Sequence, residues 1–304
     1  MLDVAVIALR WLQYSGTVVL LGGPLFLLYS FGKAGGPNVT WARPALISAA
    51  AIVAMGALAG LVAQTAVMAG SLTEALKPAT LWAMITGMAL GKAMVARAAI
   101  ALLILVVCVI LRPGRTLWSL VVATGLLIAA SFAWTGHGAA TEGSGGLVHL
   151  VAAIVHAVAA AIWLGALAVL TILLLRRTTP DDLAIHRALH GFAGMGTLAV
   201  VLLVLTGLVN SWFMVGPARI GDLGSSLYGQ LLIAKLALFG LMLGLAAEHR
   251  FRSTPALGAV LRAGEDPRPA LARLRRSVVA ETAVGAGLLG LVAWMGTLAP
   301  PSAM

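Results

Sequence analysis

The sequence GLVHLVAAIVHAVAAAIWLGALAVLTILLL, residues 146–175, decides the class of this protein. An α-helix rises ~1.5 Å per residue, so about 20 apolar residues cross the ~30 Å hydrocarbon core of a bilayer. This stretch is longer than that and contains no Lys, Arg, Asp or Glu. We therefore predict a transmembrane helix here, and the rest of the chain is interpreted around it.

Two histidines interrupt this apolar stretch. His149 and His156 are seven residues apart, so both lie on one face of the helix, and Trp163 continues that face. Polar side chains inside a membrane segment are costly, and they turn toward a protein partner or a water-filled cavity. The histidines therefore indicate a polar site within the bundle.

The composition of the whole chain supports the same class. Of its 304 residues, 61% are hydrophobic and only 10% are charged, whereas about a quarter of a soluble protein is charged. The net charge of +10 does not indicate nucleic acid, because the basic residues lie mostly in short loops between apolar segments. The single cysteine, Cys108, lies in an apolar run, which excludes a disulfide framework and a thiolate metal cluster.

Eight segments are long and apolar enough to cross a membrane. We predict an all-α polytopic protein with eight transmembrane helices, forming a single membrane domain over residues 1–304 in contact with the lipid bilayer. The first segment lacks a basic start and a cleavage pattern, so we interpret it as a retained helix. The segments are 4–31, 42–69, 84–111, 117–136, 147–175, 183–215, 227–247 and 277–298.

Loop charges predict the orientation. Cytoplasmic loops carry an excess of Lys and Arg, and one set of loops holds almost all of them here, while the other holds only Lys77 and Arg219. Both termini are therefore expected on the outer side. In this orientation His137, His149 and His156 lie toward the outer side, and His186, His190 and His249 toward the inner side.

The two halves of the chain, residues 1–137 and 146–299, resemble each other. With four helices in each half, the copies would insert in the same direction, as parallel repeats. Small-residue motifs also recur in membrane helices for packing reasons alone. The matched features, in chain order, are Gln13 and Gly22 with His156 and Gly165, Gly60-Leu61-Val62 with Gly207-Leu208-Val209, Gly91 and Arg97 with Gly229 and Lys235, and Trp134 and Gly136 with Trp294 and Gly296.

The outer histidines are candidates for a metal site that they would share. Imidazole is a common ligand of zinc, copper and iron. His149 and His156 are ~10.5 Å apart along a straight helix, whereas two nitrogens on one metal are at most ~4 Å apart. We therefore expect His137 to join one of them, with the other as a second station. The alternative is that these rings only make packing hydrogen bonds between helices.

Methionines also gather toward the outer side, and Met84 and Met88 are one turn apart on one predicted helix face. Thioethers favour Cu(I), although methionine is also an ordinary core residue. Among the intramembrane charges, Arg97 and Lys235 are candidates for a polar path, and we expect Arg10, Lys92 and Glu281 to be paired or anchored at the interface. We interpret His186 and His190 as a solvated helix start.

No P-loop, Rossmann glycine motif, HExxH, nucleophile elbow or CxxCH occurs in the chain. We therefore do not expect an enzyme. ATP-driven transport and serine or zinc hydrolysis have no motif to support them.

Several stretches together resemble the copper resistance protein D (CopD) family. The resemblance covers most of the chain in order. It rests on Arg10-Trp11-Leu12 and Gly22-Gly23-Pro24-Leu25-Phe26, on His149 and His156 followed by Ile162-Trp163-Leu164-Gly165, on Phe192, Thr206-Gly207 and Asn210-Ser211, and on Tyr228-Gly229-Gln230-Leu231-Leu232-Ile233-Ala234-Lys235.

The resemblance implies an eight-helix protein of the bacterial cytoplasmic membrane that handles copper. It further implies inward passage of copper from a separate periplasmic partner of the CopC type, with His149 and His156 as the family's histidines. Relatives often have a histidine where Gln13 stands here, so metal binding by both halves is in doubt.

Three hypotheses follow for the function. The first is a copper-binding protein that imports or passes copper, with His137, His149 and His156 as ligands and Met84 and Met88 as capture residues. The second is a b-type haem protein of electron transfer, with histidines as axial ligands. The third is a membrane scaffold in which the histidines are structural contacts.

Overall fold

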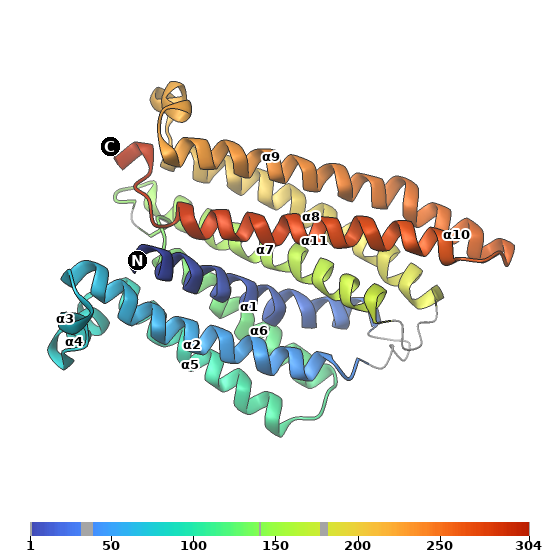
Figure 1. The fold of residues 1–304 in the computed structure, drawn as a ribbon, viewed down its shortest axis with the longest axis horizontal. Helices are drawn as coiled ribbons and strands as arrows, with labels where there is room; N and C mark the ends of the chain where they lie inside the picture. Colours follow the sequence, from blue (N-terminus) through green and yellow to red (C-terminus); the bar gives the residue numbers. More distant parts are fainter. Residues whose placement is uncertain (1, 32–38, 140, 177–181, 304) are drawn as a thin grey trace.

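The computed structural model describes residues 2–31, 39–139, 141–176 and 182–303, with only the backbone at 182–185, 187, 190 and 222. This part of the chain is helical and contains no strand. Eight of its helices are long and apolar enough to cross a membrane, which confirms the predicted all-α polytopic fold. Both termini lie at the same end of the bundle (Figure 1), as an even number of spans requires. We call this end the termini side, and the opposite end, which carries η3 and α10, the far side.

The eight long helices run in chain order with short elements between them (Figure 1). The long helices are α1 (Leu2–Phe31), α2 (Ala42–Ala69), α5 (Ala89–Ile110), α6 (Arg115–Ser131), α7 (Gly146–Leu175), α8 (Asp182–Met214), α9 (Leu227–Glu248) and α11 (Arg268–Met295). The short elements are α3 (Leu72–Ala75), α4 (Pro78–Gly87), η1 (Phe132–Trp134), η2 (Pro217–Gly224), η3 (His249–Ser253), α10 (Thr254–Ala263) and η4 (Pro301–Ala303).

The bounds of two predicted helices are wrong. The predicted helix from Met84 is two helices, because Met88 adopts an extended backbone (φ −117°, ψ 138°) between α4 and α5. Helix α9 ends at Glu248, next to the predicted end at Ala247, but it is followed directly by the π-helical turn η3 and by α10. Helix α11 begins at Arg268, nine residues before the predicted start. A hydropathy profile does not reveal the basic turns at the end of a membrane helix, because those turns are not apolar.

Helices α1 and α7 cross in close contact in the core. A Cβ added at Gly165 would lie 2.5 Å from the Cα of Gly22, and one added at Gly22 would lie 2.2 Å from the carbonyl oxygen of Ala161. Neither position has room for any side chain. Such backbone-to-backbone approach is how membrane helices associate, because burial of apolar groups from lipid provides no driving force there. Gly22 and Gly165 are also a pair that the predicted duplication matches.

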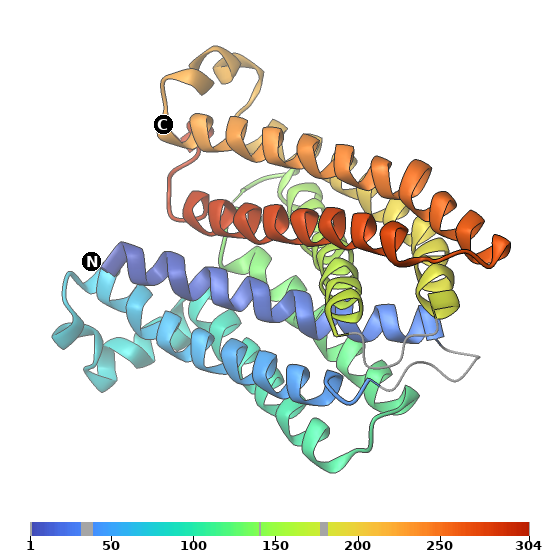
Figure 2. The same cartoon turned by 45° about the vertical axis from the view of Figure 1, so that its right-hand side comes forward.

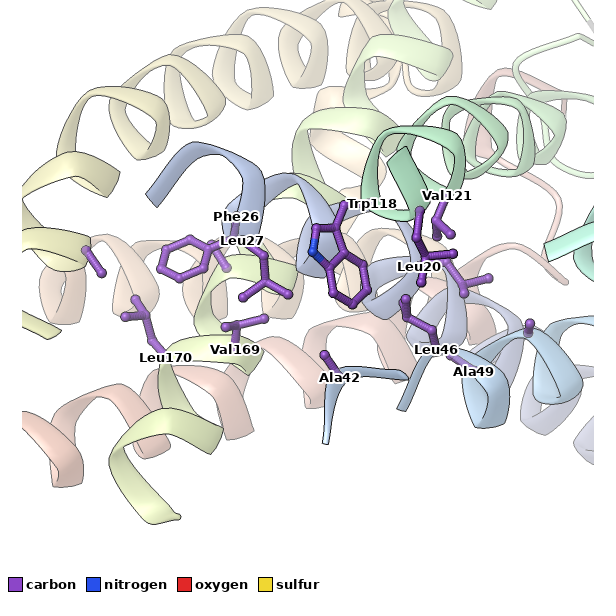
Figure 3. Close-up of a cluster of buried hydrophobic side chains, with 14 of the residues drawn as sticks. Leu20, Phe26, Leu27, Ala42, Leu46, Ala49, Trp118, Val121, Val169 and Leu170 are labelled. Atoms are coloured by element: carbon purple, nitrogen blue, oxygen red, sulfur yellow. The ribbon is translucent and has the colours of Figure 1, made fainter. Parts of the chain in front are cut away.

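The hydrophobic core continues on both sides of this crossing. Near Trp118 of α6, the side chains of Leu20, Leu46 and Val121 converge, and Phe26, Val169 and Leu170 extend the cluster (Figure 3). Cys108 is fully buried in the same cluster, as expected for a small apolar residue. The core thus ties the first four spans to α7.

Helices α8 and α9 lie at the periphery of the bundle, on the opposite side from α2 and α5 (Figure 2). Only 17% and 11% of the residues in their spanning windows are buried, compared with 56% in α7. Their exposed residues are large and apolar, for example Leu205, Leu208 and Leu236. These surfaces match lipid, and they confirm that the bilayer is the environment of the bundle.

We predict that Gly165→Ala destabilises the protein by about 1–3 kcal/mol, because its Cβ would meet the backbone of α1 rather than a side chain that could move. Gly287→Ala is the control, since a Cβ there meets nothing within 4 Å. Thermal unfolding in detergent measures both variants. Equal midpoints for the two would contradict the role given to the α1–α7 crossing.

Candidate metal site on the termini side

His149 is held in the first turn of α7. Its side chain is only 2% exposed, and a hydrogen bond of 2.6 Å joins Nδ1 to Oγ1 of Thr141 in the preceding loop. The ring stacks on Phe213 of α8, with centroids 4.9 Å apart and an interplanar angle of 9°. Orientation of a ring through one nitrogen is typical of metal-binding histidines, because it leaves the other nitrogen aimed in one direction.

His137, in the loop after η1, is a neighbour of His149, and the two rings interact electrostatically. Its Nε2 is buried and has no hydrogen-bond partner among the described residues. Burial lowers the pKa of His137, the positive charge of Arg10 lowers it further, and a backbone hydrogen bond with Leu298 acts in the opposite direction. The ring is thus kept neutral, which is the form that binds metals.

Arg10 of α1 places a fixed positive charge beside this pair. Its Nη2 donates to the carbonyl oxygen of Thr135 at 3.0 Å and to the Tyr14 hydroxyl at 3.3 Å. The guanidinium packs against Gly296, where a Cβ would approach it to 2.5 Å. Arg10 keeps His137 unprotonated but also repels a cation bound there, so any metal held at this position would be bound with modest affinity.

His156 lies in different surroundings from the other two rings. Its Nδ1 is 2.9 Å from Oγ1 of Thr206 on α8. The ring lines an apolar cavity of about 610 Å³ between α7, α8 and α9, together with Trp212 and Lys235. Neither His137 nor His149 lines that cavity. The expectation of one shared pocket for the three histidines is therefore wrong for His156.

No group of three or more His, Cys, Asp or Glu in the described ranges could hold a metal ion together. The rings of His137 and His149 interact electrostatically, whereas His156 lines a cavity that neither of them lines. A site on the termini side would accordingly rest on two imidazoles. Any further ligand of a metal ion there would come from water or from another molecule.

Arg97 of α5 is the most buried charged side chain among the described residues of the first half of the chain. It is 1% exposed and donates to Gln13 Oε1 at 2.6 Å, to Ser131 Oγ at 2.9 Å and to Thr135 Oγ1 at 3.1 Å. Its guanidinium also lies 3.8 Å from the centre of the Phe132 ring. All these partners are neutral. In the part of the chain that the structure describes, no carboxylate pairs with Arg97.

The second half has a related arrangement around His156. Lys235 of α9 interacts electrostatically with His156, as Arg97 of α5 bonds to Gln13. A Cβ at Gly60 would lie 3.3 Å from the Gln13 amide, and one at Gly207 would lie 3.6 Å from the His156 ring. These contacts join residues that the predicted duplication matches, and they are consistent with it.

The chain is similar to known proteins over most of its length. Residues 1–147 match the family model "Copper resistance protein D-like, N-terminal domain", and residues 186–295 match "Copper resistance protein D". The chain is 36% identical over 303 residues to copper resistance protein D of Pseudomonas syringae pv. tomato, covering 97% of this chain and 96% of that protein.

The chain belongs to the copper resistance protein D family. A second relative, the copper transport protein CutJ of Bacillus subtilis, is 32% identical over 126 residues, which are 41% of this chain and 22% of that protein. No solved structure matches the chain. The names of the family and of both relatives describe copper resistance or copper transport, and none names a catalysed reaction.

The methionines of this CopD-family chain are not arranged as expected. Met84 and Met88 do not share one helix face, because the extended backbone at Met88 separates α4 from α5. Met84 is 5% exposed and packs with Leu61 and Met94, whereas Met88 is 39% exposed. Their role in capturing copper stays a prediction.

Sequence reasoning missed one polar cluster on the far side. His249 Nδ1 lies 3.1 Å from Glu281 Oε2, and His249 Nε2 is 2.6 Å from Ser277 Oγ. Pairing of Glu281 was expected, but its partner was not. No pattern in the sequence indicates that His249 and Glu281, which lie on different elements, are in contact. The ring of His186 lines a cavity with this pair, and the side chain of His190 lies outside the described residues.

We predict that Arg97→Met destabilises the protein by about 1–3 kcal/mol, because it leaves the buried acceptors on Gln13, Ser131 and Thr135 without their donor. Lys92→Met on the same helix is the control, because Lys92 is exposed. Unfolding midpoints in detergent compare them. An unchanged midpoint for Arg97→Met would show that the guanidinium network does not hold α1, α5 and α6 together.

Proposed function

We propose that this CopD-family protein passes copper across the bacterial cytoplasmic membrane, and that His137 and His149 receive the ion on the termini side. The observation that carries the proposal is the pairing of a buried, hydrogen-bonded His149 with a neighbouring His137 whose Nε2 is buried and unpartnered. Buried polar atoms without partners are rare and indicate a missing ligand, water or ion. Membership of the copper resistance protein D family supports copper as the ion.

The affinity of such a site should be limited, and this suits passage. An ion that crosses a membrane must leave its binding site as well as enter it. Two imidazoles beside the positive charge of Arg10 bind a cation more weakly than a closed four-ligand site. His156, two helical turns deeper in α7, would then act as the second station, with Lys235 limiting how long the ion stays.

The proposed orientation has both termini in the periplasm. It is supported by the loop charges, because the termini side carries few Lys and Arg residues and the far side carries many. His137 and His149 would then face the periplasm. A separate copper-binding protein of the CopC type would deliver the ion there, and the exposed Met88 near the same side could take part in capture.

Haem b is the second candidate function. The observation in its favour is the apolar cavity of about 610 Å³ around His156, lined also by Trp163, Trp212 and Phe239. Haem pockets are apolar and need an axial ligand such as histidine. No second histidine among the described residues lines this cavity, so a six-coordinate haem with two axial histidines is not supported. A Soret band in the purified protein would establish this alternative.

We predict that the purified protein binds copper and that His137→Ala and His149→Ala each lower its copper affinity by tenfold or more. Because burial and Arg10 lower the pKa of His137, that ring stays neutral below the usual histidine range. Binding should therefore persist as the pH falls from 7 to about 6, where an unperturbed histidine, with a pKa near 6.5, would already be mostly protonated.

Equilibrium titration with a competing chelator at both pH values measures this affinity. Gln230→Ala is the matched control, because Gln230 is a polar side chain on the same side whose amide donates to the Gly224 carbonyl oxygen. If the triple alanine variant of His137, His149 and His156 kept its full copper content, the histidines would be structural contacts and the protein a scaffold.

A further inference from the structure

Helices α8 and α9 follow each other in the chain, but a gap separates them. Among the described residues, α8 packs on α7 and α10 and α9 packs on α11, whereas α8 and α9 hardly contact each other. The helices that the predicted duplication matches to them, α2 and α5, pack directly on each other. The second half therefore leaves open a space that the first half closes.

The gap contains a large apolar cavity on the far side. The cavity has a volume of about 880 Å³, and its lining includes Val200 and Val201 of α8, Leu243 of α9 and Leu167 of α7. Helices α8 and α9 lie at the periphery of the bundle (Figure 2), and Val201 is 47% exposed. The cavity therefore opens sideways, toward the bilayer.

The end of the cavity nearest the aqueous phase is basic. Helix α9 has 22 residues, a length of about 33 Å, so Arg250 in the following turn η3 lies where the chain leaves the hydrocarbon core. Arg262 of α10 lines the same cavity, and both arginines are exposed. Long cationic side chains at this position extend to the level of the lipid headgroups.

The described protein groups around these two arginines do not neutralise them. Arg250 Nη1 donates to the Thr197 hydroxyl and, at 3.4 Å, to the carbonyl oxygen of Ala193, both on α8. In the part of the chain that the structure describes, no carboxylate forms an ion pair with Arg250 or Arg262. Both positive charges are therefore available to an anion at the mouth of the cavity.

The carboxylate in the cavity lining is enclosed by the protein. Glu281 of α11 is 0% exposed, and its Oε2 lies 3.1 Å from Nδ1 of His249. His186 of α8 is the remaining ionisable residue of the lining, and it is only partly exposed. The fully exposed charges of the lining are thus both positive.

An apolar cavity with a basic mouth matches an anionic phospholipid. Phosphate oxygens accept charge-assisted hydrogen bonds from arginine, and basic pockets between membrane helices bind anionic headgroups. The acyl chains of one leaflet cross about 15 Å, which is half of the ~30 Å core. The cavity adjoins the one around His156 at Trp163, which lines both. Along α9, Arg250 is about 16 Å from Phe239 of that second cavity, so the gap is long enough for an acyl chain.

We propose that an anionic phospholipid of the bilayer binds between α8 and α9, with its phosphate on Arg250 and Arg262 and an acyl chain in the apolar cavity. The lipid takes the place of the direct helix contact that α2 and α5 make in the first half. The site involves neither His137 nor His149, so it stands or falls independently of the proposed copper function.

Native mass spectrometry of the full-length protein, delipidated in detergent, tests the proposal. Titration with phosphatidylglycerol and with phosphatidylcholine of the same acyl chains measures the affinity for the first lipid bound. Phosphatidylglycerol should bind about 25-fold more tightly, because each arginine near the membrane surface contributes about fivefold. Inorganic phosphate should not displace it, because phosphate has no acyl chain. Equal affinities for the two lipids, or displacement by inorganic phosphate, would overturn the proposal.

Charge variants assign the preference to the two arginines. The double variant Arg250→Gln with Arg262→Gln should reduce the ratio of the two affinities to about 1. Arg252→Gln with Arg275→Gln is the matched control, because both residues are exposed on the far side and neither lines the cavity. The control should keep the 25-fold ratio. The same ratio in both double variants would overturn the assignment.

A substitution without charge tests the place of the acyl chain. Gly194 of α8 lines the cavity, and a Cβ there meets nothing within 4 Å, so a larger side chain has room to enter. Gly194→Trp should weaken phosphatidylglycerol binding tenfold or more, because each buried CH₂ contributes about fourfold. Gly287→Trp on α11, outside the cavity and equally unobstructed, is the control and should bind as the wild type.

Two results with these glycine variants contradict the proposal. Unchanged affinity in Gly194→Trp would show that the lipid binds elsewhere. A wild-type dimer that Gly194→Trp dissociates would show that a second copy of the chain, and not a lipid, fills the gap.

Discussion

The fold depends on the contact between α1 and α7 at Gly22 and Gly165. No Cβ fits at either position, so the two backbones touch, and α2, α6, α8 and α11 pack against one or both of these helices. The contact also brings the polar residues of the two helices to comparable depths. Gln13 and His156 each precede their glycine by nine residues, and each faces a glycine of the next spanning helix, Gly60 or Gly207. The contact between Gly22 and Gly165 thus places one polar residue in each half, Gln13 in the first and His156 in the second.

The two positions have become chemically different. In the first half Gln13 and Arg97 belong to a buried network in which the described partners of Arg97 are neutral. In the second half His156 and Lys235 line a cavity, and the second half also contains His149 and the His249–Glu281 pair. The titratable groups that line these cavities therefore lie in the second half, and His137, the last residue of the first half, is the neighbour of His149.

Hydropathy predicted the eight spans because each needs a long run of apolar side chains, which is a local property. It did not predict the break at Met88, which depends on backbone geometry, or the basic helical turns in η3 and at the start of α11, which are not apolar. The site was predicted in part. The seven-residue spacing identified His149 and His156, but Thr141, Phe213 and Arg10, which give the rings different surroundings, come from other elements.

The central claim is that copper is held by the imidazoles of His137 and His149, and X-ray absorption spectroscopy of the copper-loaded protein tests it most directly. The account predicts nitrogen scatterers at about 2 Å with the multiple scattering of imidazole rings, lost together in His149→Ala. A copper environment made only of sulfur, or one unchanged in His149→Ala, would contradict it.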